Sequence, residues 1–427
     1  MTQKFQADVI IVGAGLAGMV AAHEAIQRGR RVLMIDQEGP QSLGGQAHWS
    51  LGGLFMVDTP EQRRLGIRDS AELALTDWMA SAQFDRTEDA NPRAYAERFI
   101  EWSAGDMRGW LHDLGMRWFP VVGWAERGGA LAGGHGNSVP RFHITWGTGT
   151  GVVAPFAKLM QSYAASGKLN MQFRHRVSML DVTSGAVTGV SGDILQDTDA
   201  PRGESTSREV TGSFHHEAEA VILTTGGIGA DHDLVRKHWP VDRLGHPPRR
   251  MISGVPDYVD GKMHAIAAQA GAGLINQDRM WHYCEGVKNW NPIWPNHGIR
   301  ILPGPSSVWL DAKGDRMEPP CMPGFDTLTT LKRILQAGEH SWFILTQKII
   351  EKEFALSGSE QNPDLTDGGW REVLAARLGK GATAAVEMFK NKGEDFVVAD
   401  DLTQLVAGMN LLTPDQRLDP EHLRGAD

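Results

Sequence analysis

The first strongly patterned stretch of the chain alternates between apolar runs and glycines. Residues 9–12 (VIIV) are apolar and β-branched, which is typical of a buried parallel strand. A glycine-rich break at residues 13–18 follows, and the pattern is then helical as far as about Gln27. Residues 31–35 form a second apolar run that ends at Asp36. This order predicts a strand, a glycine turn, a helix and a second strand with an acid at its end.

Four later segments also carry a readable pattern. Residues 221–225 predict a buried strand that ends in a glycine pair, and residues 177–192 alternate around Ser184-Gly185 as in a hairpin. The stretches 341–354 and 396–409 are expected to be helical. No internal repeat interrupts this organisation.

Two glycine-containing segments allow different interpretations. The RGESTSR segment at residues 202–208 is polar and is expected to be an exposed loop. The GTGTG segment at residues 147–151 precedes a helical run from Val152. It is either a second anion-binding turn or a plain glycine-rich helix entry.

The first glycine turn has the spacing of a dinucleotide-binding motif. It consists of Gly13, Ala14, Gly15, Leu16, Ala17 and Gly18. The first glycine permits a tight turn, the second lets the backbone approach a pyrophosphate, and the third allows close packing of helix on strand. The helix N-terminus attracts phosphates, and Asp36 has about the spacing at which a carboxylate binds a ribose. The motif predicts dinucleotide binding without choosing between NAD and FAD.

Composition narrows the class of protein. The 427 residues suffice for two or three domains, and a net charge of −10 without a basic cluster argues against nucleic acid. Two cysteines are too few for a disulfide framework, and we expect no metal site. No uninterrupted apolar run reaches the roughly 18 residues of a membrane span, so we expect a cytoplasmic protein.

A second glycine-bracketed loop favours FAD. Residues 44–53 read GGQAHWSLGG, residues 224–227 read TTGG, and residues 259–272 read VDGKMHAIAAQAGA. Together they resemble the FAD-binding domain of the fumarate reductase and succinate dehydrogenase flavoprotein superfamily. The words GGQAHWSLGGLF and MISGVPDYVDGKM look most like bacterial dehydrogenases related to 3-ketosteroid Δ1-dehydrogenases.

This resemblance implies an α/β fold in which a Rossmann-like FAD-binding domain of the GR2 type carries an α+β substrate cap. We place the FAD-binding domain at residues 1–278 and the cap at residues 279–427. Family members return to the FAD domain at their C-terminus with a glycine-rich turn and a helix that faces the flavin. The sequence contains no such segment. We therefore expect a truncated form in which the flavin-ring end of the site is incomplete.

The resemblance also implies a set of cofactor contacts beyond the first turn. They are Gly44, Gly45, Gln46, Ala47, Ser50, Gly52, Gly53, Val177, Thr225, Gly226, Gly227 and Asp260. Members that attach flavin covalently use a histidine in this loop, and Gln46 occupies that position. We therefore expect non-covalent FAD. His48 is either a cofactor contact or, as we favour, a loop histidine that packs near Trp49.

The implied chemistry adds or removes hydrogen across a C–C bond next to a carbonyl, which needs a proton-transfer group and a carbonyl-polarising group. Tyr283 stands where fumarate reductases carry a substrate-binding histidine, and we expect it to transfer the proton. His282 is its neighbour in an extended segment, so both cannot face the flavin. Arg300 and Arg316 are candidate clamps, although Arg316 also fits a surface hairpin turn.

The substrate is expected to be a small apolar carbonyl compound, because the segment 290–309 is rich in Trp and Pro. Trp124 lies where ketosteroid enzymes have a tyrosine, which weakens the case for steroid specificity. Two alternatives stay open: a fumarate-reductase-like reductase of small unsaturated acids, and a non-catalytic nucleotide-binding fragment or subunit. Whether the chain forms a homo-oligomer is also open.

Overall fold

The fold is built around a four-stranded parallel sheet. The computed structural model describes residues 6–124, 126–379 and 381–425. The strands lie in the order β10 (Ala220–Leu223), β1 (Val9–Val12), β2 (Val32–Ile35) and β6 (Leu169–Gln172). All three pairings are parallel, which confirms the predicted α/β fold.

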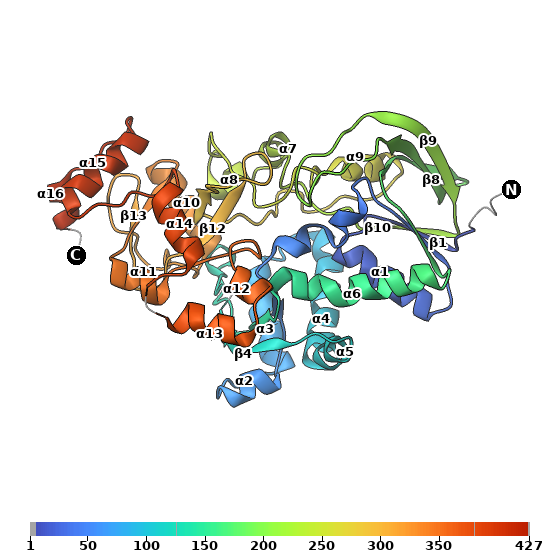
Figure 1. The fold of residues 1–427 in the computed structure, drawn as a ribbon, viewed down its shortest axis with the longest axis horizontal. Helices are drawn as coiled ribbons and strands as arrows, with labels where there is room; N and C mark the ends of the chain where they lie inside the picture. Colours follow the sequence, from blue (N-terminus) through green and yellow to red (C-terminus); the bar gives the residue numbers. More distant parts are fainter. Residues whose placement is uncertain (1–5, 125, 380, 426–427) are drawn as a thin grey trace.

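Two helices cover one face of this sheet. Helices α1 (Leu16–Gln27) and α6 (Thr148–Ala165) contact each other and lie below the strands in Figure 1. Because side chains alternate between the two faces of a strand, Ile11 and Met34 both pack into the cluster formed with these helices. The predicted end of the first helix near Gln27 is confirmed.

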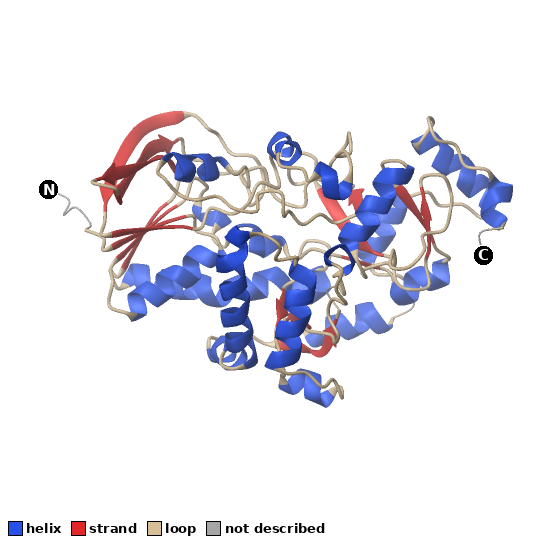
Figure 2. Cartoon of the chain, turned by 180° about the vertical axis from the view of Figure 1, so that it is seen from behind, coloured by secondary structure: helices blue, strands red, loops and turns tan. Residues whose placement is uncertain are grey.

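An antiparallel sheet covers the opposite face. It consists of β7 (His175–Thr183), β8 (Ala186–Leu195) and β9 (Val210–Glu217), and α9 (Lys262–Gln269) lies against it. Figure 2 shows these strands and those of the parallel sheet at the end of the molecule that carries the N-terminus. The predicted hairpin is confirmed: Ser184 and Gly185 form its turn with φ of +51° and +81°.

A third sheet and several helices complete the N-terminal half. The antiparallel order is β3 (Gly53–Phe55), β5 (Phe142–Thr145) and β4 (Trp118–Gly123). The helices are α2 (Pro60–Arg64), α3 (Ala71–Ala82), α4 (Ala90–Ala104) and α5 (Met107–Asp113), and a short 3-10 helix, η2, spans Gly45–Trp49.

Short strands and helices make up the remainder of the chain. Two small sheets form, one from β11 (Gly286–Lys288), β12 (Gly298–Leu302) and β15 (Ala355–Leu356), the other from β13 (Val308–Asp311) and β14 (Ser341–Ile344). The helices are α7 (His232–Lys237), α8 (Val241–Leu244), α10 (Thr327–Ala337), α11 (Gln347–Glu353), α12 (Pro363–Thr366), α13 (Trp370–Leu378), α14 (Ala384–Lys392), α15 (Leu402–Leu412) and α16 (Pro420–Arg424).

Two of the expected helices begin later than predicted. The first four residues of the stretch 341–354 form β14, which pairs with β13, and only α11 is helical. Within the stretch 396–409, α15 begins at Leu402, because the Asp401 side chain accepts a hydrogen bond from the Gln404 N–H and caps the helix there.

One ion pair crosses the expected domain boundary after residue 278: Arg279 Nη2 lies 2.6 Å from Asp85 Oδ1. Beside it, within residues 1–278, both terminal guanidinium nitrogens of Arg86 lie 2.7 Å from the two Asp278 oxygens. The division into residues 1–278 and 279–427 remains a prediction. Within the described residues, none of the helices combines the length and apolarity needed to cross a bilayer.

Candidate functional site

The glycines of the turn between β1 and α1 differ in how much space surrounds them. Gly13 has a φ of +103°, and a Cβ there would lie 2.5 Å from the carbonyl oxygen of Thr224. A Cβ at Gly18 would lie 2.0 Å from the carbonyl oxygen of Gly13, so a side chain would push α1 away from the strand. A Cβ at Gly15 would meet nothing within 4 Å. The turn is therefore open at the position where backbone approaches a phosphate in such motifs.

Asp36 braces this turn. Its Oδ2 accepts the Ala14 N–H at 2.7 Å, and its Oδ1 accepts the Glu38 N–H at 2.8 Å. Burial raises the pKa of the Asp36 carboxyl, and the two backbone N–H groups oppose that shift. The carboxylate holds the backbone around the turn, and its contact with a ribose remains a prediction.

The second glycine motif lies directly against the first. The Gly44 N–H donates to the Ala14 carbonyl at 2.9 Å. A Cβ at Gly45 would lie 3.1 Å from the Gly15 Cα. The structure therefore brings together the two glycine motifs that the sequence predicts to hold the cofactor.

The start of α6 packs on the same loop. The Gly149 N–H donates to the Ser50 carbonyl at 2.9 Å, and a Cβ at Gly149 would lie 2.3 Å from the Ala47 carbonyl oxygen. Likewise, a Cβ at Gly52 would lie 2.3 Å from the carbonyl carbon of Thr148. Glycine at position 149 therefore allows α6 to pack closely on the loop. The Ser50 carbonyl of the loop accepts a hydrogen bond from one of the first N–H groups of the helix. This supports the plain helix entry over a second anion-binding turn.

The middle of the loop lies beside the end of β10. A Cβ at Gly226, which follows Thr225 and precedes Gly227, would lie 3.6 Å from Gln46 Nε2. The His48 ring packs edge-on against Trp49 at a centroid distance of 5.1 Å, as we favoured. Burial, helped by the charge of Arg202, lowers the pKa of His48 to about 4.

Three other predicted cofactor contacts have partners within the protein. Val177 is buried in β7, and a Cβ at Gly53 would lie 1.8 Å from the Phe142 ring. Asp260 Oδ2 lies 2.7 Å from Lys262 Nζ, and its Oδ1 accepts the Lys262 N–H at 3.1 Å. Their roles toward a cofactor stay predictions.

The RGESTSR segment between β8 and β9 is a loop, as predicted, but it is only partly exposed: Glu204 and Ser205 are exposed, and the other five residues are half-buried or buried. Thr206 Oγ1 and Arg208 Nη1 donate to the two carboxylate oxygens of Glu38, at 2.9 Å and 2.6 Å. Gly203 is buried against Trp49, where a Cβ would lie 2.6 Å from the ring. These contacts join segments far apart in the chain, so the local pattern could not reveal them.

Two buried donors next to this loop have no acceptor in the described part of the chain. They are Arg202 Nη1 and the O–H of Tyr258, whose oxygen interacts with the Trp49 indole. A buried donor without an acceptor is costly, so an acceptor-rich group is expected there. Together with the open space at Gly15, these donors fit the ADP half of FAD.

Tyr283 and Arg300, which both belong to the expected cap at residues 279–427, lie in contact with each other. The Arg300 guanidinium lies 4.2 Å from the centre of the Tyr283 ring, which is 56% exposed. Arg300 Nε donates to Glu285 Oε2 at 3.0 Å, while its Nη2 is buried and unpartnered among the described residues. The pair offers a phenol at the surface and a free buried donor next to it.

The other two candidate catalytic residues lie apart from this pair. The His282 ring packs 4.6 Å from the Trp239 ring, and burial, with a smaller effect of Arg243, lowers its pKa to about 4. His282 and Tyr283 thus have different surroundings, as alternation predicts. Arg316 is exposed in the turn after β13, and its backbone pairs with Leu310.

Glu126 is a candidate that sequence reasoning missed. It is 7% exposed, and its Oε1 accepts the backbone N–H of Thr327. Burial raises the pKa of Glu126 to about 7, and the charge of Arg300 counteracts part of the shift. Its place in a glycine-rich polar segment gave no signal, because its burial comes from contacts with residues about 200 positions away.

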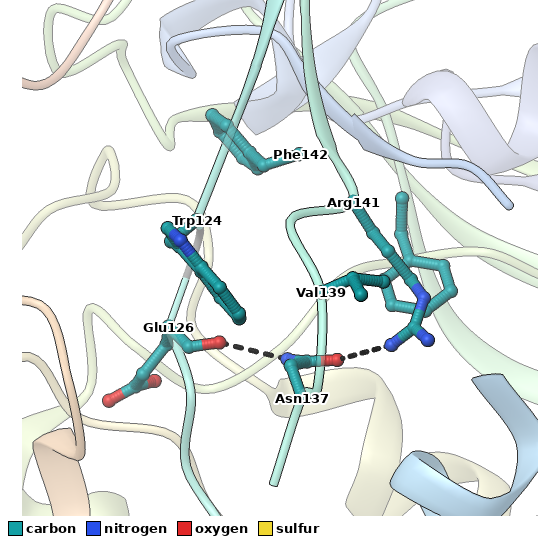
Figure 3. A pocket seen from close by; sticks show the side chains of 7 residues that line it. Trp124, Glu126, Asn137, Val139, Arg141 and Phe142 are labelled. Atoms are coloured by element: carbon teal, nitrogen blue, oxygen red, sulfur yellow. Dashed lines mark hydrogen bonds between the residues drawn. The ribbon is translucent and has the colours of Figure 1, made fainter. Parts of the chain in front are cut away.

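Trp124 borders a cavity of about 40 Å³ (Figure 3). Its lining residues are Phe55, Trp124, Glu126, Asn137, Val139, Arg141 and Phe142. Asn137 donates to the Glu126 carbonyl at 2.8 Å and accepts from Arg141 Nη1 at 3.0 Å, and the Glu126 carboxylate points away from the cavity. Sites for drug-sized ligands measure roughly 300–1,000 Å³. This cavity is too small for such a substrate.

The parallel sheet, the glycine turn and the unpartnered donors are typical of a dinucleotide-binding protein. The family model of the FAD binding domain matches residues 8–424, and the chain belongs to this family. A KsdD-like steroid dehydrogenase of Mycolicibacterium smegmatis is 57% identical over 405 residues, which are 95% of this chain and 73% of that protein. The chain is therefore an FAD-dependent oxidoreductase, as the sequence resemblance implies.

Solved structures share the fold. The 3-ketosteroid-Δ4-(5α)-dehydrogenase of Rhodococcus jostii RHA1, in complex with 4-androstene-3,17-dione, has a TM-score of 0.57 at 20% identity, over 82% of this chain and 68% of that one. The open form of a flavocytochrome c3 fumarate reductase has a TM-score of 0.59 at 22% identity, over 82% of this chain and 54% of that one. The predicted fold class is confirmed.

Proposed function

We propose that this chain is a dehydrogenase that removes two hydrogens from adjacent carbons beside the ketone of a steroid-like substrate. The similarity to a KsdD-like steroid dehydrogenase, over nearly the whole chain, supports this substrate class. Exposed Trp124 and Trp281 and half-exposed Tyr283 provide aromatic surface of the kind that binds fused hydrocarbon rings.

The observation that carries the reaction is the pairing of Tyr283 with Arg300. Tyr283 acts as the base in its deprotonated form: the phenolate takes the proton from the carbon next to the carbonyl and becomes the neutral hydroxyl, which then releases the proton to solvent. Arg300 orients the ring and donates from its free Nη2 to the carbonyl oxygen, on which negative charge develops. FAD supplies the two-electron acceptor when it is bound.

FAD is held without a covalent bond in this proposal. Gln46 occupies the loop position at which a histidine would attach the flavin, and an amide side chain cannot form that link. Acid precipitation of the yellow protein should leave colourless protein and free FAD in solution. Flavin that stays with the precipitate would contradict this part of the proposal.

The substrate class is tested by incubating the FAD-loaded protein with 4-androstene-3,17-dione and an artificial electron acceptor. The proposal predicts a steroid product that lacks two hydrogens, detected by mass spectrometry, together with reduction of the acceptor. The matched experiment offers fumarate and a reduced dye. Reduction of fumarate without turnover of the steroid would favour the small-acid reductase instead.

A further inference from the structure

We propose that Arg202 binds the diphosphate of FAD, so that the loop between β8 and β9 forms a wall of the cofactor site. The inference rests on FAD binding by this family and extends it to a residue outside the two glycine motifs. Four features of the structure support it: the position of the guanidinium, its missing counter-ion, the donor beside it and the anchoring of its loop.

Arg202 reaches the edge of the second glycine motif. Its Nη2 donates to the Leu43 carbonyl at 3.1 Å. The next residue, Gly44, donates its N–H to Ala14 in the first glycine turn at 2.9 Å. The guanidinium therefore lies where the two glycine motifs meet, and a phosphate at the open Gly15 would be close to this junction.

No carboxylate forms an ion pair with Arg202 in the part of the chain that the structure describes. Its Nη1 is buried without a partner. Burial lowers the pKa of the guanidinium, and Tyr258 opposes the shift. By contrast, Arg208 in the same loop pairs with Glu38. A partly buried cation without a counter-ion is unfavourable, and an arginine fork matches the geometry of phosphate oxygens. An anionic ligand would supply the negative charge that Arg202 lacks.

A second donor faces the same space. The buried Tyr258 hydroxyl interacts with the Trp49 indole, and its own O–H has no acceptor within the described residues. It lies near Arg202: Gly203 packs on the Trp49 ring, and the charges of Arg202 and Asp36 both act on the pKa of the Tyr258 hydroxyl, which burial raises. Arg202 Nη1 and the Tyr258 O–H thus both lack an acceptor, which indicates a ligand rich in acceptor oxygens such as the diphosphate.

The loop that carries Arg202 is fixed in place. Thr206 and Arg208 bind the buried Glu38 carboxylate, and the Ser205 hydroxyl donates to Asp257. Gln41 Nε2 donates to the Ala200 carbonyl at 2.9 Å just before the loop. Arg202 is thus held in position by its neighbours, so little side-chain ordering remains to be done when the phosphate binds.

The test compares ADP with adenosine, because the two differ by the diphosphate alone. Isothermal titration of both ligands is measured for the protein freed of FAD, for Arg202→Ala and for Arg202→Lys. Glu204→Ala, an exposed substitution in the same loop, is the matched control. Thermal unfolding and FAD affinity are recorded for every variant, so that a folding defect is seen directly.

Arg202→Ala should weaken ADP and FAD binding by about 10- to 100-fold, the range for losing a hydrogen bond to a charged group, and leave adenosine unchanged. Arg202→Lys should lie between, and Glu204→Ala should match the wild type. An unchanged ADP-to-adenosine affinity ratio in Arg202→Ala would overturn the proposal, as would an equal loss for both ligands. Failure of the wild type to bind any ADP would count against the nucleotide site itself.

Discussion

The expected nucleotide site, formed by the two glycine motifs and Arg202, differs from the Tyr283–Arg300 pair in how its arginine is neutralised. We call the first region the nucleotide end. At the nucleotide end, Arg202 carries a buried donor with neither carboxylate nor acceptor among the described residues. At the pair, Arg300 is bound to Glu285, and Glu126, with a pKa of about 7, can take or release a proton near neutral pH. The first region requires an anion from outside, whereas the second is already balanced and suits a neutral carbonyl substrate.

This difference explains how one chain can hold a highly charged cofactor and an apolar substrate. In our proposal the cofactor's charge is met by the partly buried Arg202 and by the helix N-terminus at Gly15. The substrate side keeps one free donor, Arg300 Nη2, for a single oxygen. The following changes test the contrast, from the largest expected effect to the smallest.

Gly15→Leu should weaken FAD and ADP binding by at least about 10²-fold, because the side chain fills the phosphate approach and several contacts of about 1 kcal/mol are lost together. The free energy of unfolding should fall by only about 1 kcal/mol, since a Cβ there meets nothing within 4 Å. Unchanged ADP affinity in Gly15→Leu would place the nucleotide elsewhere.

Gly18→Ala should instead affect mainly stability. Its Cβ would lie 2.0 Å from a carbonyl oxygen, so denaturant unfolding should show a free energy of unfolding that is lower by about 1–3 kcal/mol.

Tyr283→Phe should reduce steroid turnover by roughly 10²-fold while the bound FAD content stays the same, because only the proton-transfer group is removed. Turnover is measured with saturating acceptor, and FAD content by absorbance. Tyr95→Phe, at a 62% exposed position on α4, is the control and should turn over normally. Near-normal turnover in Tyr283→Phe would show that this hydroxyl does not move the proton.

Glu126→Gln should change how stability depends on pH. The pKa of Glu126 is raised from 4.5 to about 7, so its folded state favours the protonated form. Its stabilising contribution is full below about pH 4.5 and is lost as the pH rises through about 7. The variant should therefore gain on the order of 1–3 kcal/mol relative to the wild type between these limits.

Chemical denaturation at a series of pH values measures this difference. Glu360, whose pKa burial also raises to about 7, acts in the same direction in both proteins and cancels from the comparison. His48, His282 and His297 act in the opposite direction, because burial lowers their pKa values to about 4. A difference that does not vary between pH 4.5 and 7 would show that the Glu126 carboxyl is ionised in the folded protein.

Arg316→Ala should have the smallest effect, a change in turnover within about twofold, because exposed substitutions away from a site shift free energies by less than about 0.5 kcal/mol. Arg316 lies in an exposed turn, whereas Arg300 is beside Tyr283. Steady-state kinetics of Arg316→Ala and of Arg300→Ala compares the two positions directly. A tenfold loss in Arg316→Ala would make it a substrate clamp after all.

The sequence predicted the strand, turn and helix of the nucleotide-binding motif correctly because their signals are local. Strand, glycine turn, helix and Asp36 follow one another within one supersecondary unit, and Gly13 and Gly18 each have a steric reason at their own position. The hairpin at Ser184-Gly185 could be predicted for the same reason, because its alternating strands and its turn are adjacent in the sequence.

The features that the sequence did not reveal depend on long-range contacts. Glu126 is buried by its approach to Thr327, and the RGESTSR loop is held by Glu38. Residues 341–344 form β14 because β13 pairs with them, and no helical or strand period is visible over four residues. Such pairings are set by the fold as a whole, so local periodicity could not predict them.

Anaerobic mixing of the FAD-loaded protein with a 3-ketosteroid tests the central claim most directly. If the chain removes hydrogen from carbons beside the ketone, the visible flavin absorbance should bleach in a single turnover, and Tyr283→Phe should slow the bleaching by roughly 10²-fold without changing its final extent. Flavin that stays oxidised in the presence of the steroid, while the protein is folded and fully loaded with FAD, would contradict the account.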